Sequence, residues 1–200
     1  MAASESSPSG SSSLADTVAR FVSFATAGTL ALTQDLTHAV LQSIGDMEGT
    51  DAELVAEESL CLVATASARA AQVGLRERPG VAEPVHRAVL ALPFVYRDYL
   101  IGSAMLASSD ASLADVGETV RSRLQRKQQF YTSHLPENQF PGPRALKDKM
   151  ELWMGRVSPP KLPESPQERL QTLGLVDDVA VHCKLLLAYG RNEKAPTNDA

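Results

Sequence analysis

The segment PVHRAVLALPFVYRDYLIGSAMLA, which runs from Pro84 to Ala107, carries apolar residues on nearly every face of a helix. A helix that is apolar all round belongs in the interior of a domain, so we expect this segment to be the central helix of the fold. Pro93 lies in its middle and removes one backbone hydrogen bond, which predicts a kink or a break near Ala91 and Leu92.

The sequence on both sides of this segment is also helical in its periodicity. Apolar residues recur every three or four positions, and no stretch alternates for long with the period of two that is typical of a strand. The predicted helices cover residues 14–45, 51–76, 84–107, 113–133, 144–155 and 166–189. The serine-rich residues 1–13 and the residues 191–200 are expected to be disordered tails. The predicted fold class is therefore all-α: a single domain over 14–190, an antiparallel bundle of five or six helices with a long N-terminal helix and disordered termini.

Composition supports a folded helical protein. Of the 200 residues, 44% are hydrophobic and 22% charged, as in ordinary globular domains, and the 5% of aromatic residues disfavours a sheet. The two cysteines, Cys61 and Cys183, have no CxxC spacing, which is typical of a reducing compartment and predicts a cytoplasmic or nuclear protein. The longest uncharged run near the start, Phe21 to Gln34, is too short to cross a membrane.

Motifs for phosphate, zinc or calcium binding are absent from the sequence, as is a nucleophile elbow. We therefore predict no catalytic residue, no cofactor and no metal site. Asp178 and His182 are four residues apart on one predicted helix, and the interpretation favoured for them is a helical salt bridge or a partly buried histidine with a hydrogen-bond partner.

Charge is divided unevenly along the chain. Residues 1–75 hold nine acidic and two basic residues, whereas residues 76–200 hold 15 acidic and 17 basic ones, within a total net charge of -5. This asymmetry either orients self-association or matches the two halves within one fold. Its sharpest element is a basic segment on the fourth predicted helix, with Arg121, Arg123, Arg126 and Lys127. That segment is either a solvated helix face or a contact for nucleic acid or another anionic surface.

The linker before the last predicted helix contains two serines that precede a proline, Ser158 and Ser165, which are candidate phosphorylation sites.

Two shorter features concern helix packing and helix ends. Gly28 inside the first helix predicts a bend or the close approach of a neighbouring helix, and Thr50-Asp-Ala-Glu53 has the form of a capping box.

These features support three functional hypotheses. The first is a non-catalytic intracellular protein-interaction module, an adaptor or a subunit of an assembly that contacts other proteins through apolar helix faces. It rests on the first helix, whose length of roughly 45 to 50 Å would overreach a compact domain and leave part of it for a partner. The second is nucleic-acid or anionic-surface binding through residues 121–127. The third is an enzyme or small-ligand carrier with a pocket beside Pro93, near Tyr96, Arg97, Asp98 and Tyr99.

Overall fold

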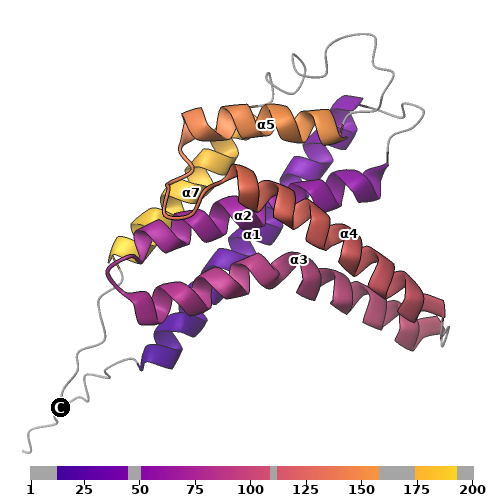
Figure 1. Ribbon diagram of the computed structural model, residues 1–200, viewed down its shortest axis with the longest axis horizontal. Helices are drawn as coiled ribbons and strands as arrows, with labels where there is room; N and C mark the ends of the chain where they lie inside the picture. The colour runs from indigo at the N-terminus through magenta and orange to yellow at the C-terminus, as the bar shows by residue number, and fades with distance from the viewer. Residues whose placement is uncertain (1–12, 45–50, 109–111, 158–173, 193–200) are drawn as a thin grey trace, which may run out of the picture.

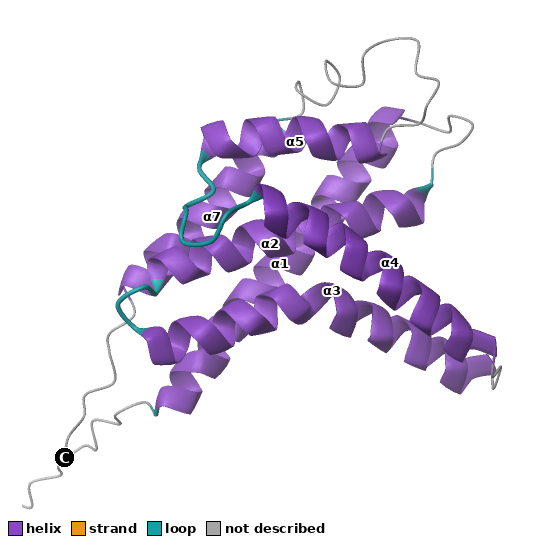
Figure 2. Cartoon of the chain, in the orientation of Figure 1, coloured by secondary structure: helices purple, strands orange, loops and turns teal. Residues whose placement is uncertain are grey.

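The computed structural model describes residues 13–44, 51–108, 112–157 and 174–192. These residues form six α-helices and, within the described ranges, no strand (Figure 2). The helices are α1 (Leu14–Ile44), α2 (Ala52–Gly74), α3 (Pro79–Ser108), α4 (Ser112–His134), α5 (Pro143–Val157) and α7 (Leu175–Asn192). The predicted all-α bundle with a long N-terminal helix is confirmed.

Helix ends lie close to the predicted positions where the local capping chemistry is strong. At the start of α1, Ser13 Oγ accepts a hydrogen bond from Asp16 N, and Asp16 Oδ2 accepts one from Ser13 N, both at 3.1 Å, which closes a capping box. Helix α3 begins five residues earlier than predicted, because Pro79 takes the first helical turn and Pro84 lies inside the helix. The predicted start of the last helix, at residue 166, lies outside the described residues.

The central helix is α2, so the prediction that residues 84–107 form the core helix was wrong. Figure 1 shows α2 in the middle of the bundle, and it contacts each of the other five described helices. Its residues are buried almost without interruption from Glu57 to Ala71. The physical reason is side-chain size: the segment from Ala64 to Ala71 holds five alanines with Thr65 and Ser67, and these small side chains let neighbouring helices approach α2 closely.

Helix α3 belongs to the bundle only in its first half. Val81, Val85, Val89 and Leu92 are buried, and their spacing of three and four residues places them on one face of α3. The helix is unbroken at Pro93, which stands at the middle of its sequence, and Figure 1 shows that α3 changes direction near its midpoint. The expected kink is therefore present without a break.

Beyond the bend, the second half of α3 leaves the bundle together with the start of α4. Residues 95–108 and 112–120 lie side by side and project from the body of the molecule (Figure 1). We call this pair of half-helices the α3–α4 arm. Ile101 faces Gly117 across it, with only 3.5 Å between Ile101 Cγ2 and the position that a Cβ would occupy at Gly117.

The first helix does not overreach the fold, so the feature on which the interaction hypothesis rested was wrong. Its inward stripe is buried by the rest of the chain from one end to the other, and it contacts α2, α3 and α7. That buried stripe consists of Thr17, Phe21, Ala25, Thr29, Thr33, Leu36 and Val40. The three most exposed of the large apolar side chains, Val95, Tyr99 and Leu106, lie elsewhere, on the arm.

Glycines allow α7 to pack very closely on the bundle. A Cβ added at Gly190 would stand 3.0 Å from the carbonyl carbon of Gly74, and one added at Gly74 would stand 3.0 Å from the Leu187 oxygen. The backbones of α2 and α7 thus touch at this crossing. Gly28 plays a related part on α1, because a Cβ there would meet His182 Cε1 at 2.7 Å, which confirms the predicted close approach of a neighbour.

Candidate functional site

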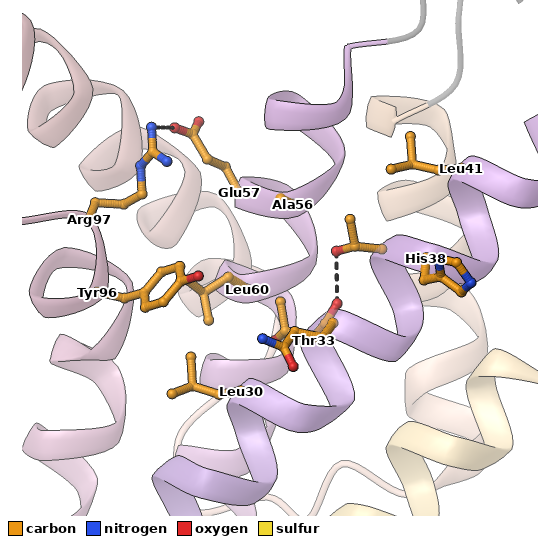
Figure 3. Close-up of a pocket in the computed structure, with 11 residues that line it drawn as sticks. Leu30, Thr33, His38, Leu41, Ala56, Glu57, Leu60, Tyr96 and Arg97 are labelled. Atoms are coloured by element: carbon orange, nitrogen blue, oxygen red, sulfur yellow. Dashed lines mark hydrogen bonds and ion pairs between the residues drawn. The ribbon is translucent and has the colours of Figure 1, made fainter. Parts of the chain in front are cut away.

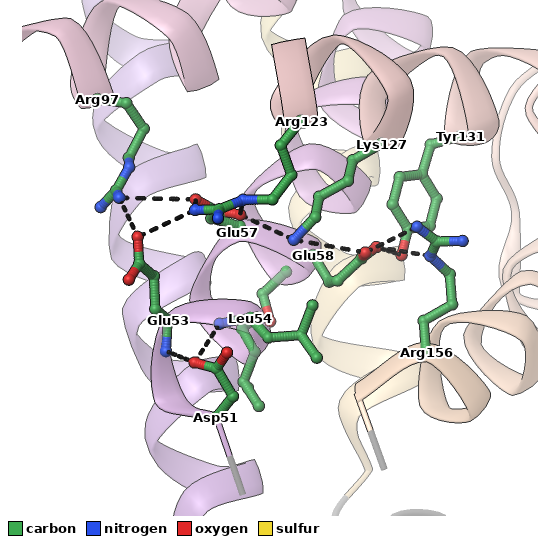
Figure 4. Close-up of polar contacts among 12 residues, drawn as sticks. Asp51, Glu53, Leu54, Glu57, Glu58, Arg97, Arg123, Lys127, Tyr131 and Arg156 are labelled. Carbon is green, nitrogen blue, oxygen red and sulfur yellow. Dashed lines mark hydrogen bonds and ion pairs between the residues drawn. The ribbon is translucent and has the colours of Figure 1, made fainter. Parts of the chain in front are cut away.

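A set of seven charged side chains joins α2 to three neighbouring helices (Figure 4). We call it the ion-pair cluster. Its carboxylates all come from the first two turns of α2 and its cations come from α3, α4 and α5. The members are Glu53, Glu57, Glu58, Arg97, Arg123, Lys127 and Arg156.

Glu57 is the acceptor at the centre of the cluster. Arg123 donates to both of its oxygens, from Nε to Oε2 at 2.9 Å and from Nη2 to Oε1 at 2.6 Å. Lys127 Nζ donates to Oε2 at 2.8 Å, and Arg97 Nη2 lies 3.6 Å from Oε1. Both Glu57 and Lys127 are buried, so this is an ion pair inside the protein rather than a surface contact.

Glu58, the next residue, faces α4 and α5. Its Oε2 accepts from the Tyr131 hydroxyl at 2.7 Å and from Arg156 Nε at 2.8 Å, and Arg156 Nη2 donates to Oε1 at 2.8 Å. The Arg156 guanidinium also lies over the ring of Phe130, 4.4 Å from its centroid. Glu58 therefore fixes α5 against α4 through one carboxylate.

The cluster shifts the protonation of its members. Burial by itself raises the pKa of Glu57, but the hydrogen bonds from Arg123 and Lys127 outweigh it and hold that pKa below its ordinary value. The hydrogen bond to Glu57 raises the pKa of Arg123, and the one to Glu58 raises the pKa of Arg156. Burial, followed by the charge of Glu58, raises the pKa of Tyr131. Glu57 is thus held as a carboxylate and Tyr131 as a neutral hydroxyl.

The predicted basic segment divides between this cluster and the surface. Arg123 and Lys127 are paired with Glu57, and Arg121 pairs with Asp98 while lying 5.8 Å from the centroid of the Phe94 ring. Only Arg126 of the four is exposed without an internal ion pair among the described residues. The structure therefore does not bring the four cations together as one open basic patch.

Sequence reasoning missed the carboxylates that receive these cations. Glu53 was assigned to a capping box with Thr50, whereas the helix cap is Asp51, whose carboxylate accepts from the Glu53 and Leu54 amides. The Glu53 side chain instead bonds to Arg97, and to Arg123 Nη2 at 3.1 Å. The available signal was the pair of adjacent acids, Glu57 and Glu58, in a helix whose following turns hold mainly small and aliphatic residues. These ion pairs join the acidic first part of the chain to its more basic remainder. Of the two interpretations of the charge asymmetry, they fit the matching of the two halves within one fold.

A groove of about 270 Å³ opens between α1, α2 and α3, just beyond the bend at Pro93 (Figure 3). Its lining is mainly apolar, with polar side chains from α1 and α3. The lining residues are Leu30, Thr33, Gln34, Thr37, His38, Leu41, Ala56, Glu57, Leu60, Tyr96 and Arg97. Two of the four residues expected to border a pocket, Tyr96 and Arg97, lie on it; Asp98 and Tyr99 do not.

The arm exposes a stripe of large apolar side chains. Val95, Tyr99 and Leu106 are 61%, 69% and 89% exposed, and their spacing of four and seven residues places them on one face of α3. Within the described residues, Pro79–Ala107 is the one helix with the length and composition of a membrane span, which alone is weak evidence because core helices share it. In this helix only 17% of the most apolar stretch is buried inside the protein.

His182 lies in a polar chain between α1, α2 and α7, and it does not pair with Asp178. Its Nε2 is 3.0 Å from Ser67 Oγ, which in turn accepts from Thr29 Oγ1 at 2.9 Å. Burial lowers the pKa of His182, so the ring is neutral at pH 7. The partly buried, hydrogen-bonded histidine is the interpretation that the structure supports.

We expect acidification from pH 7.5 to 5.5 to destabilise the protein partly through His182. Its pKa is lowered on folding, so the unfolded chain binds more protons below about pH 6.5 and stability falls as pH falls through that range. The loss in the free energy of unfolding, measured by urea titration at both pH values, should be smaller in His182→Gln than in the wild type. His38→Gln, at an exposed histidine of α1, is the control. An equal loss in His182→Gln and wild type would contradict the role of His182.

Neither the two candidate phosphorylation sites nor the two cysteines form part of a site among the described residues. Ser158 and Ser165 lie outside the described residues. Cys61 and Cys183 are buried and unpaired; burial raises the pKa of both thiols, that of Cys183 to about 12. In the described ranges, no three His, Cys, Asp or Glu side chains gather as metal ligands would.

Comparisons of the chain with models of protein families, with curated proteins and with solved structures give no significant match.

Proposed function

We infer that this protein is a non-catalytic interaction module whose contact surface is the α3–α4 arm. The observation that supports this most directly is the exposed stripe of Val95, Tyr99 and Leu106. Exposed apolar surface of this kind in a folded protein marks contact sites, because leaving it in water has a free-energy cost. The first half of α3 is held in the bundle, so the projecting half is the part that is presented to a partner.

The charges beside the stripe indicate the partner's chemistry. On the adjoining part of α4, Asp115 and Glu118 are both exposed, whereas the cations of this region, Arg97 and Arg121, are engaged with Glu53 and Asp98. A partner helix that is apolar on one face and carries lysine or arginine beside that face complements this surface. An anionic lipid surface is disfavoured by the same acidic residues.

We therefore expect the protein to bind an 18-residue peptide of leucine and lysine arranged as an amphipathic helix. A labelled peptide titrated by fluorescence anisotropy should bind at least tenfold more weakly to Tyr99→Ser or Leu106→Ser than to wild type, because each variant removes apolar contact area. Leu185→Ser is the matched control, since Leu185 is a similarly exposed leucine on α7. The equivalent peptide of leucine and glutamate should bind at least tenfold more weakly to the wild type.

Three results would count against the proposal. These are equal affinity for the two peptides, unchanged affinity in both arm variants, and tighter binding to phosphatidylserine vesicles than to the basic peptide. The alternative function of nucleic-acid binding through residues 121–127 draws less support, because Arg123 and Lys127 are paired with Glu57. It would require a steep loss of oligonucleotide affinity with rising salt.

A further inference from the structure

The groove between α1, α2 and α3 has one apolar part and one charged end. Leu30, Leu41 and Leu60 contribute aliphatic wall from α1 and α2, and Figure 3 shows Tyr96 reaching from α3 toward Leu60. Arg97 stands at the other end, where it meets Glu57. A site with an apolar body and a few polar groups at one end is the usual form of a small-molecule site.

Arg97 has a hydrogen-bonding group that the protein leaves unused. Its Nη2 bonds to Glu53 and lies 3.6 Å from Glu57, but its Nε is buried and meets no acceptor among the residues that the structure describes. A buried guanidinium N–H without an acceptor has a substantial desolvation cost. Arg97 lines the groove, so an acceptor that entered its charged end and reached Nε would remove this cost.

The ion-pair cluster to which Arg97 belongs has more cations than carboxylates. Four cations, Arg97, Arg123, Lys127 and Arg156, face three carboxylates, so the cluster has a surplus of one positive charge (4 − 3 = 1). The nearby Asp51 keeps its negative charge, but its carboxylate accepts from the backbone amides at the start of α2, where the positive end of the helix dipole offsets part of that charge. One ligand carboxylate would balance the surplus.

The size of the groove limits the ligand. Its 270 Å³ is close to the lower end of the ~300 to 1,000 Å³ that is usual for small-molecule pockets, which favours a small ligand of roughly ten non-hydrogen atoms. We propose that the groove binds a small aliphatic monocarboxylate, whose carboxylate accepts from Arg97 Nε and whose chain lies against Leu30, Leu41 and Leu60. Tyr96 and Arg97 come from the base of the arm, but the site uses none of the exposed stripe of Val95, Tyr99 and Leu106.

Octanoate is a suitable probe, because it has one carboxylate and a chain of the right size. Isothermal titration of the full chain should give one saturable site for octanoate, with at least tenfold weaker binding of methyl octanoate and no saturable binding of octylamine. Arg97→Lys keeps the positive charge but removes Nε, and we expect at least a tenfold loss of affinity. Arg121→Lys, at an exposed arginine paired with Asp98, should bind as wild type does.

A second variant separates ligand binding from any effect of Arg97 on folding. Ala56 lines the groove, so Ala56→Leu should fill it and abolish octanoate binding while Arg97 stays in place. Ala52→Leu, one turn earlier on the exposed part of α2, is its matched control, and circular dichroism checks that each variant is folded. Equal binding of octanoate and its methyl ester, wild-type affinity in Ala56→Leu, or no saturable octanoate binding would overturn the proposal. Peptide binding by the arm would be unaffected by any of these results.

Discussion

Glu57→Gln should lower the free energy of unfolding by about 3 to 5 kcal/mol, because it removes the nearer of the two carboxylates that pair with a buried lysine. Lys127 Nζ lies 2.8 Å from Glu57 and 3.6 Å from Glu58, and its side chain is 6% exposed (Figure 4). The glutamine amide can accept one hydrogen bond but cannot balance both Lys127 and Arg123. Urea unfolding followed by circular dichroism measures the change.

Two further variants test this explanation. Glu53→Gln changes a half-exposed acid of the same cluster and should cost less than about 1 kcal/mol. In the double variant Glu57→Gln with Lys127→Met, the buried cation is gone, so part of the lost stability should return. A Glu57→Gln protein within about 1 kcal/mol of wild type would show that the cluster is solvated and contributes little.

Trp153→Ala should cost about 3 to 5 kcal/mol through the cavity that it leaves. Trp153 on α5 is completely buried, and with Leu146 it forms the part of the core that α5 shares with α2 and α7. Without this anchor, α5 would retain chiefly the Arg156–Glu58 contact. Because Trp153 is the only tryptophan, unfolding of this variant must be followed by circular dichroism rather than by fluorescence.

Leu152→Ala is the control for Trp153→Ala. Leu152 is the preceding residue of the same helix and is 41% exposed, so its truncation should cost less than about 1.5 kcal/mol. If the two variants were equally destabilised, α5 would not be anchored by its buried face.

The fold class could be predicted from the sequence, but the arrangement of the helices could not. Periodicity places the helices because it is a local property of the chain, and the box of Ser13 and Asp16 fixes a helix start in the same way. The central position was assigned to α3 because its side chains are more apolar. In this protein the helix with the smallest side chains is the most buried instead. Helix α2, with the small residues between Ala64 and Ala71, is the one that all the other described helices contact.

The candidate sites depend on contacts that no spacing in the sequence encodes. The basic residues Arg123 and Lys127 were found by their density, but their partner Glu57 is more than sixty residues away in the chain. The groove and the arm both follow from the bend at Pro93. Sequence predicts that bend, yet it does not predict which way the second half of α3 turns or which side chains it leaves exposed.

The crossing of Gly74 and Gly190 restricts which pairs of substitutions the protein can accept. At most core positions, enlarging one side chain can be compensated by shrinking the one that it touches. Here each residue faces main-chain atoms and has only hydrogen to offer, so neither can be made smaller to accommodate the other. Second-site suppressors of a bulky residue at either glycine should therefore map to positions that shift α7 as a whole.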